Sequence, residues 1–266
     1  MAVTVVALAT AGLSAAPANA ARIGVDPVTA IQRQLIDGRG VKLTLRSSSN
    51  VFRKWDKHKP EIGTAAFGDG RVVATDVTDH DFRGPGIRTI CVGGHRYDTE
   101  EVGDPGPRFP SGKTWIDLGR SQCGRHLEVG RIRLDEPGML TAVLATTTSK
   151  RPAGVYDGTH TMLHQGTITF GQLFKASPRM RADFGGQAVR QFTPWTISWR
   201  LWIGDDQLVR RAWSSWREPD AMDDNPRGYI AFIRDLRLSG WGIKVRIKAP
   251  ARSVTTTLEE IHGYGS

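Results

Sequence analysis

The sequence lacks most of the patterns that identify an enzyme or a membrane protein. No G-x-S-x-G nucleophile elbow, P-loop or dinucleotide-binding glycine motif occurs in its functional context. No apolar run beyond the first twenty residues is long enough to span a bilayer, and no repeat, coiled coil or shift in composition marks a second domain. We therefore expect a single domain that is not an enzyme and uses no cofactor. A hydrolase with an unrecognised site is one alternative.

Cysteine is scarce: Cys91 and Cys123 are the only two in the chain of 266 residues. A single pair is typical of an exported protein with one disulfide, so we predict a bond between them. It would enclose the Pro- and Gly-rich segment 103–112 and contribute about 3.5 kcal/mol in the chain-entropy model. Two free buried thiols are the alternative.

Charged side chains are missing from the start of the chain, where Arg22 is the first. Val3–Leu13 is apolar, and Ala18–Ala20 has the A-x-A form that signal peptidase recognises. We expect residues 1–20 to be a signal peptide of a secreted protein and residues 21–266 to form one domain. An apolar N-terminal helix of the mature protein is the alternative. No cysteine follows the predicted cleavage site, so no lipid anchor is expected there.

The net charge of +9 comes from 27 arginines and 9 lysines against 27 acidic residues. These basic residues are spread along the chain, which is more typical of a solvated exterior than of a nucleic-acid-binding stripe. We therefore expect no nucleic-acid partner. A basic surface outside the cell favours anionic neighbours such as a membrane surface or a cell-wall polymer.

Alternation of apolar and polar residues with period two dominates the chain, as in Val41, Leu43 and Leu45. This pattern predicts antiparallel strands that are wetted on one side. Gly93–Gly94 predicts a two-residue hairpin turn, because both residues can adopt positive φ. The strands are expected within residues 41–46, 70–77, 86–102, 113–119, 196–216, 229–241 and 242–250.

Helical patterns are few. Asp26 and Pro27 have the residue types of an N-cap and a first helical position, and Gly38 is the expected stop. An apolar face beginning at Met139 predicts a second helix over residues 139–149. Two short helical turns are expected within residues 170–186, and Ser177 and Pro178 begin the second. A large antiparallel sheet with a few amphipathic helices packed on it is an α+β fold.

Tryptophan is concentrated in one hairpin: five of the eight lie between Pro194 and Trp216. Trp199 shares a face with Ile197, Leu201 and Ile203, whereas Trp202 points to the opposite face. The first face is expected to line either an ordinary core or a cavity for an apolar ligand, and both readings stay open. Trp202 or Trp213 would pack beneath a loop or form an exposed patch.

The order of several segments resembles a known family. "DPVTAIQRQLIDGRGV", "RTICVGGHRYDTEEV", "EPGMLTAVLATTT", "YDGTHT…GTITFGQL" and "WIGDDQLVRR" follow one another as in the actinobacterial secreted and lipoprotein relatives of the LolA-like fold, of the LppX and LprG type. The resemblance covers about residues 22 to 262. It implies a strongly curved, unclosed antiparallel half-barrel with helices packed on its concave face. Several family members hold acyl chains there, and many carry a lipobox cysteine that this chain lacks.

These observations predict a secreted monomer that binds a hydrophobic small molecule or lipid between sheet and helices. An extracytoplasmic sensor or interaction domain with a filled core, which binds a protein or cell-wall partner, is the alternative function. No metal site is expected, because His160 and His164 lack the Glu of H-E-x-x-H and Asp76–Asp81 lacks the calcium-loop pattern. The residues expected to line the cavity are Met139, Leu140, Val143, Leu144, Leu173, Phe174, Ile197, Trp199, Leu201 and Phe232.

Overall fold

One large open sheet organises the chain. The computed structural model describes residues 25–50, 54–80, 86–99, 109–120, 127–184, 192–219 and 229–263. Thirteen strands form the sheet in the order β10-β11-β12-β13-β14-β1-β3-β4-β5-β6-β7-β15, with β2 paired to β1. All neighbours are antiparallel except β7 and β15, which are parallel. A separate hairpin is formed by β8 and β9.

The strands are β1 (Arg39–Ser49), β2 (Asp56–Lys57), β3 (Glu61–Gly68), β4 (Arg71–Asp79), β5 (Ile87–Val92), β6 (His95–Thr99), β7 (Trp115–Asp117), β8 (Glu128–Val129), β9 (Ile132–Arg133), β10 (Thr147–Tyr156), β11 (Thr159–Thr169), β12 (Thr196–Gly204), β13 (Val209–Pro219), β14 (Tyr229–Lys244) and β15 (Thr255–Thr257). The helices are α1 (Pro27–Gln32), α2 (Pro137–Ala145), α3 (Phe170–Ala176), α4 (Pro178–Asp183) and α5 (Leu258–Gly263), with a short 3-10 turn at Arg252–Val254.

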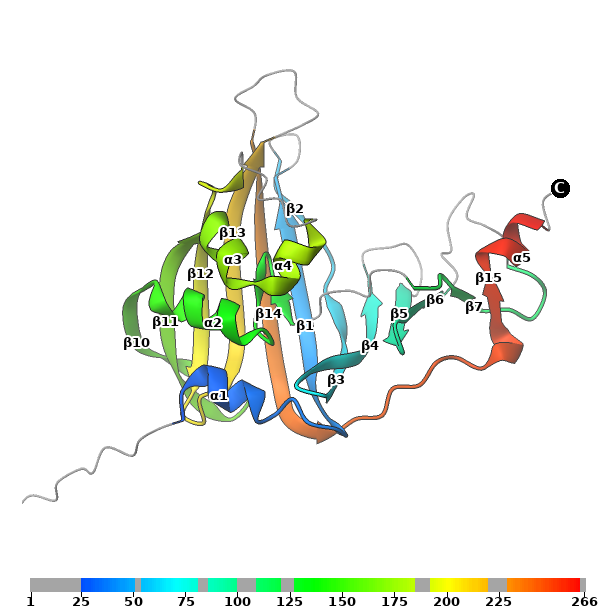
Figure 1. Ribbon diagram of the computed structural model, residues 1–266, viewed down its shortest axis with the longest axis horizontal. Helices are drawn as coiled ribbons and strands as arrows, with labels where there is room; N and C mark the ends of the chain where they lie inside the picture. The colour runs from blue at the N-terminus through cyan, green and yellow to red at the C-terminus, as the bar shows by residue number, and fades with distance from the viewer. Residues whose placement is uncertain are drawn as a thin grey trace, which may run out of the picture.

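Helices α1 to α4 lie across one face of the sheet, whereas β4 to β7, β15 and α5 extend beyond them (Figure 1). The predicted α+β architecture, a large unclosed antiparallel sheet with helices on its concave face, is therefore confirmed. Register shifts interrupt the ladders between Gly40 and Lys42 and between Trp202 and Ile203. Such bulges increase local twist and bend a strand, which allows a sheet of this width to curve.

The helix starts agree with their sequence signals. Asp26 caps α1 by accepting hydrogen bonds from two backbone amides, and Pro27 is the first helical residue. Thr169 and Gln172 form a capping box at α3. Helix α1 ends at Gln32, earlier than the expected stop at Gly38.

The predicted helix over residues 139–149 was wrong in its last turn. Helix α2 ends at Ala145, and β10 begins at Thr147. The threonines that follow α2 are β-branched, and they favour a strand when a pairing partner is present. β11 supplies that partner on one side. β10 is an edge strand, which is where Pro152 is tolerated.

The strand predicted over residues 242–250 was also wrong beyond Lys244. β14 ends there because its partner β1 begins at Arg39, which pairs with Lys244. One further bond joins the Val245 amide to the Gly38 carbonyl. The chain then runs as an extended segment toward β15 (Figure 1).

The tryptophan hairpin has the predicted faces. Ile197, Trp199, Leu201 and Ile203 are all buried on the side that carries the helices. Trp202 lies on the other side without forming an exposed patch, because the Arg211 guanidinium stacks 4.4 Å from its ring centroid. Cation–π stacking therefore covers this indole.

The signal peptide predicted at residues 1–20 and the acidic segment 220–226 lie outside the described residues. Among the described residues, no helix has the length and apolarity needed to cross a membrane.

Candidate site between helices and sheet

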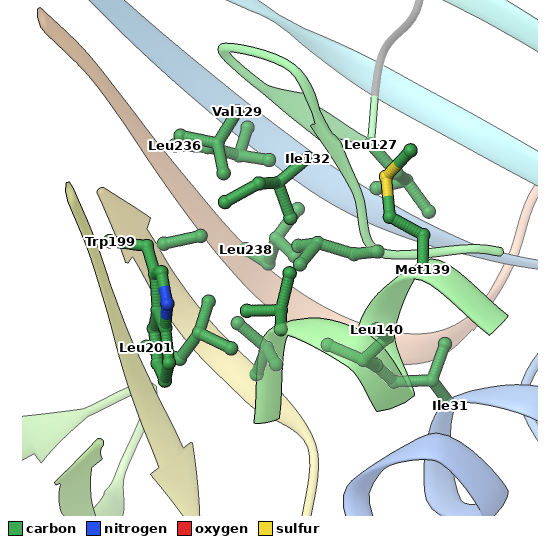
Figure 2. Packing of buried hydrophobic residues seen from close by; sticks show 14 of the residues in the cluster. Ile31, Leu127, Val129, Ile132, Met139, Leu140, Trp199, Leu201, Leu236 and Leu238 are labelled. Carbon is green, nitrogen blue, oxygen red and sulfur yellow. The ribbon is translucent and has the colours of Figure 1, made fainter. Parts of the chain in front are cut away.

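The ten residues predicted to line a cavity meet in one place. Eight of them belong to a single hydrophobic cluster of buried side chains, and Leu144 and Phe232 pack against it while partly exposed. Figure 2 shows Met139 and Leu140 on α2, with Trp199 and Leu201 on β12 among the side chains of the facing sheet. These side chains, from segments far apart in the chain, therefore share one buried cluster, and their role as the lining of a ligand cavity stays a prediction.

The space between the layers is filled in this conformation. Leu140, Val143 and Leu201 expose 0% of their surface, and Trp199 exposes 1%. A side chain that bordered a void large enough for water would expose area to it. In the described structure these residues therefore contact other side chains, and a ligand can reach them only after the layers separate.

One hydrogen bond ties the end of α2 to the sheet. The indole N–H of Trp199 donates to the hydroxyl of Thr146 at 3.1 Å. Gly166 of β11 permits this approach, since a Cβ there would lie 2.1 Å from the Thr146 carbonyl oxygen and 2.8 Å from the Trp199 ring. The sequence analysis missed Gly166, although a glycine inside an alternating strand is a signal of close backbone approach.

Polar bonds connect the helices to one another. Ser177, between α3 and α4, donates to Glu136 at the start of α2 over 2.6 Å, and both are buried. The same hydroxyl accepts from the Met180 amide and so caps α4. Arg179 of α4 pairs with Asp135 at 2.9 Å. α2 and α4 are thus joined by charge-assisted bonds at their N-terminal ends.

A second ion pair links α4 to the β8–β9 hairpin. The nearly buried guanidinium of Arg133 contacts Asp183 of α4 at 2.5 Å and Glu128 at 3.1 Å. Gln32 of α1 donates to the backbone carbonyl of Asp135 at 3.4 Å. The helices and this hairpin therefore form one cross-linked layer, whereas the side chains that face the sheet from α2 and α3 are apolar.

Aromatic rings border the cluster beside α3 and α4. Phe170 makes edge contacts with Phe184 at 5.5 Å and with Phe192 at 6.0 Å, and Phe192 lies 4.3 Å from Trp195. Phe184, Phe192 and Trp195 are only partly buried. These three rings therefore border the cluster on its partly exposed side, and they were not among the predicted residues.

His164 lies on the same sheet face as Leu201, its partner on β12. Its Nδ1 is buried without a hydrogen-bond partner among the described residues. Burial, with a smaller contribution from Lys150, holds the pKa of His164 below its usual value. No group of three or more His, Cys, Asp or Glu side chains suited to a metal occurs in the described part of the chain.

Cys91 lies buried in β5 and forms no disulfide with another described residue, and Cys123 lies outside the described residues. The disulfide between them stays a prediction.

A cavity of about 1070 Å³ lies elsewhere, beside β3, β4 and the segment that follows β14. None of the ten predicted residues lines it.

No protein-family model and no curated protein matches the chain. Among solved structures, LprF from Mycobacterium bovis is similar with a TM-score of 0.46 and 16% identity, over 83% of this chain and 97% of LprF. The lipoprotein LppX from Mycobacterium tuberculosis is similar with a TM-score of 0.42 and 17% identity, over 84% of this chain and 98% of LppX. A LolA superfamily protein from Nitrosomonas europaea is similar with a TM-score of 0.27 and 12% identity, over 86% of this chain and 97% of that protein. LppX and LolA are the names to which the sequence resemblance points.

Proposed function

We propose that this chain is a secreted, non-enzymatic binding protein that holds a hydrophobic ligand, such as an acyl chain, between its helical layer and its sheet. The ligand space forms when α2, α3 and α4 move away from β11 and β12 as one unit. The basic outer surface of the protein binds an anionic membrane surface or cell-wall polymer. The protein acts as a monomer.

The observation that carries this proposal is the distribution of polar bonds. The Glu136–Ser177, Asp135–Arg179 and Arg133–Asp183 bonds lie within the helical layer and its hairpin. Only the Trp199–Thr146 bond has been identified between α2 and the facing strand β12. Separation of α2 from β12 would therefore break one polar bond. The β8–β9 hairpin is itself held to β13, because Ser214 donates to the Val129 carbonyl and Arg131 pairs with Glu218, so the hairpin stays on the sheet and the Arg133–Asp183 bond is lost when the helices move.

The energetic balance favours exchange of apolar surfaces. Opening exposes the apolar faces of α2 and β12 to water, which costs a free energy of about 25 cal/mol per Å² of exposed apolar area. An acyl chain that enters covers both faces and is itself removed from water, which contributes about 0.8 kcal/mol for each methylene buried. A long chain thus offsets the cost of opening without polar chemistry, whereas a short chain does not.

A second candidate function is an extracytoplasmic interaction or sensor domain whose core stays filled. The complete burial of Leu140, Val143 and Leu201 favours it. In that case the helices would stay on the sheet, and a protein or cell-wall partner would bind the outer surface.

Photo-crosslinking distinguishes the two. Hexadecanoate with a diazirine on its chain is incubated with the full chain, irradiated and mapped by peptide mass spectrometry. The proposed function predicts labels in α2 (Pro137–Ala145) and β12 (Thr196–Gly204) that excess unlabelled hexadecanoate removes. No competable label in either element, together with no lipid retained in native mass spectra of protein from its own host, would contradict it.

A matched pair of variants locates the site. Leu201→Ala removes side-chain volume beneath α2, and Ile116→Ala does the same at a buried position of β7 outside the cluster. We expect Leu201→Ala to change the labelling yield in α2, whereas Ile116→Ala leaves it unchanged.

A further inference from the structure

A row of small residues crosses four strands on the face of the sheet away from the helices. Gly40 of β1 pairs with Ala66 of β3, Ala66 with Ala74 of β4, and Ala74 with Val92 of β5. The adjacent Val41 and Ala65 belong to the core cluster, so alternation places the row on the opposite face. Four strands at about 4.8 Å spacing make the row roughly 14 Å long.

The segment after β14 forms a wall of this row. Val245 packs so closely on Gly40 that a Cβ there would lie 2.7 Å from its Cγ2 atom. Ile247 and Arg246 continue the wall, and the turn at Gly93–Gly94 borders the opposite end. The result is a trough of about 1070 Å³ with an apolar floor. Pockets that hold small ligands measure about 300–1,000 Å³, so its volume suffices for one.

The rim of the trough carries positive charge. Arg71, Arg120 and Arg246 line it, all are exposed, and none of the three forms an ion pair with another described residue. Asp37 and Asp69 also line it, so three arginines and two aspartates leave one net positive charge. A guanidinium group binds a carboxylate or phosphate through two parallel hydrogen bonds. The guanidinium groups of these three arginines are available for an added anion.

We propose that this trough is a second binding site, for a single-chain anionic amphiphile. The acyl chain lies along the row from Ala66 to Val92, and the anionic head group is held by Arg71 and Arg246. Binding here needs no movement of the helices and is independent of the site beneath them.

The same diazirine hexadecanoate tests the trough, read from labels in β4 (Arg71–Asp79) and in residues 245–247. Ala74→Phe fills the floor and is expected to lower these labels more than tenfold. The Arg71→Gln and Arg246→Gln double variant is expected to lower them about tenfold. Arg151→Gln, an exposed arginine of β10 outside the trough, serves as the control and leaves them unchanged.

Three competitors separate the chemistries. Unlabelled hexadecanoate is expected to remove the trough labels, hexadecanol to compete at least fivefold less well, and acetate not to compete. Equal competition by hexadecanol, competition by acetate, or labels unchanged in the double arginine variant would each overturn the proposal. The arginine variants alter only exposed side chains, so they test it even where Ala74→Phe fails to fold. Labels in α2 and β12 report the site beneath the helices separately, so either site can fail alone.

Discussion

Replacing Thr146 with valine perturbs the single polar bond between the end of α2 and Trp199. The valine cannot accept from the indole N–H, which donates to the hydroxyl at 3.1 Å. The Val143 carbonyl, which accepts from the same hydroxyl, keeps its bond from the Thr146 amide. A buried donor left without a partner costs about 1–3 kcal/mol. At roughly 2–4 °C per kcal/mol for a domain of this size, the melting temperature should fall measurably.

The same substitution should strengthen ligand binding. Opening of the layers breaks the Trp199–Thr146 bond in the native protein, whereas the variant has no such bond to lose. The open state therefore becomes more populated, and apparent affinity rises in proportion to that population. A shift of 1–3 kcal/mol corresponds to about 5–150-fold. Titration calorimetry with hexadecanoate measures the affinity, and thermal unfolding measures the stability.

Thr161→Val provides the matched control. Its hydroxyl donates to the Gly154 carbonyl at 2.7 Å between β11 and β10, away from α2. We expect this variant to lose stability without any gain in affinity. A Thr146→Val protein that is less stable but binds hexadecanoate no better than the wild type would refute the opening of the helical layer.

Three further substitutions test the fold. Burial, and then the facing Asp79, raise the pKa of Glu61. The folded protein therefore holds this proton more tightly than the unfolded chain does, so the wild type loses stability as the pH rises from about 4.5 through the raised pKa. Glu61→Gln should be more stable than the wild type at pH 7 and gain nothing at pH 4, and an equal gain at both would contradict this. Gly166→Ala should unfold well below the wild-type temperature because its Cβ meets backbone at 2.1 Å, whereas Gly158→Ala meets nothing within 4 Å and only strains a positive φ. Ser177→Ala removes the Glu136 partner and a helix cap and should cost about 1–3 kcal/mol by urea unfolding; a loss below 0.5 kcal/mol would show that Glu136 finds another donor.

Local signals in the sequence determined the starts of helices and the faces of strands. Asp26 and Ser177 cap helices because their side chains reach backbone amides two or three residues away. The face shared by Ile197 and Trp199 follows from the period of two in any strand. Such features depend on neighbours along the chain, so they can be predicted from the sequence without knowledge of the fold.

Pairing partners decided where elements end. The threonines after α2 became β10 because β11 lies beside them, and β14 stopped at Lys244 because β1 begins opposite that residue. Hydrogen bonds between strands satisfy backbone groups only where a partner is present. A partner far along the chain leaves no trace in a local window, so both ends were predicted wrongly.

The sequence alone determined which apolar side chains lie between the helices and the sheet, because the amphipathic pattern of each helix and strand indicates which of its faces is buried. Only the tertiary structure decided that these side chains fill their space and that a trough lies on the other face. Packing depends on the distance between layers, which the Ser177–Glu136 bond and Gly166 set through contacts between distant segments. The trough likewise requires Gly40, Ala66, Ala74 and Val92 to come into one register, and register is a property of the assembled sheet.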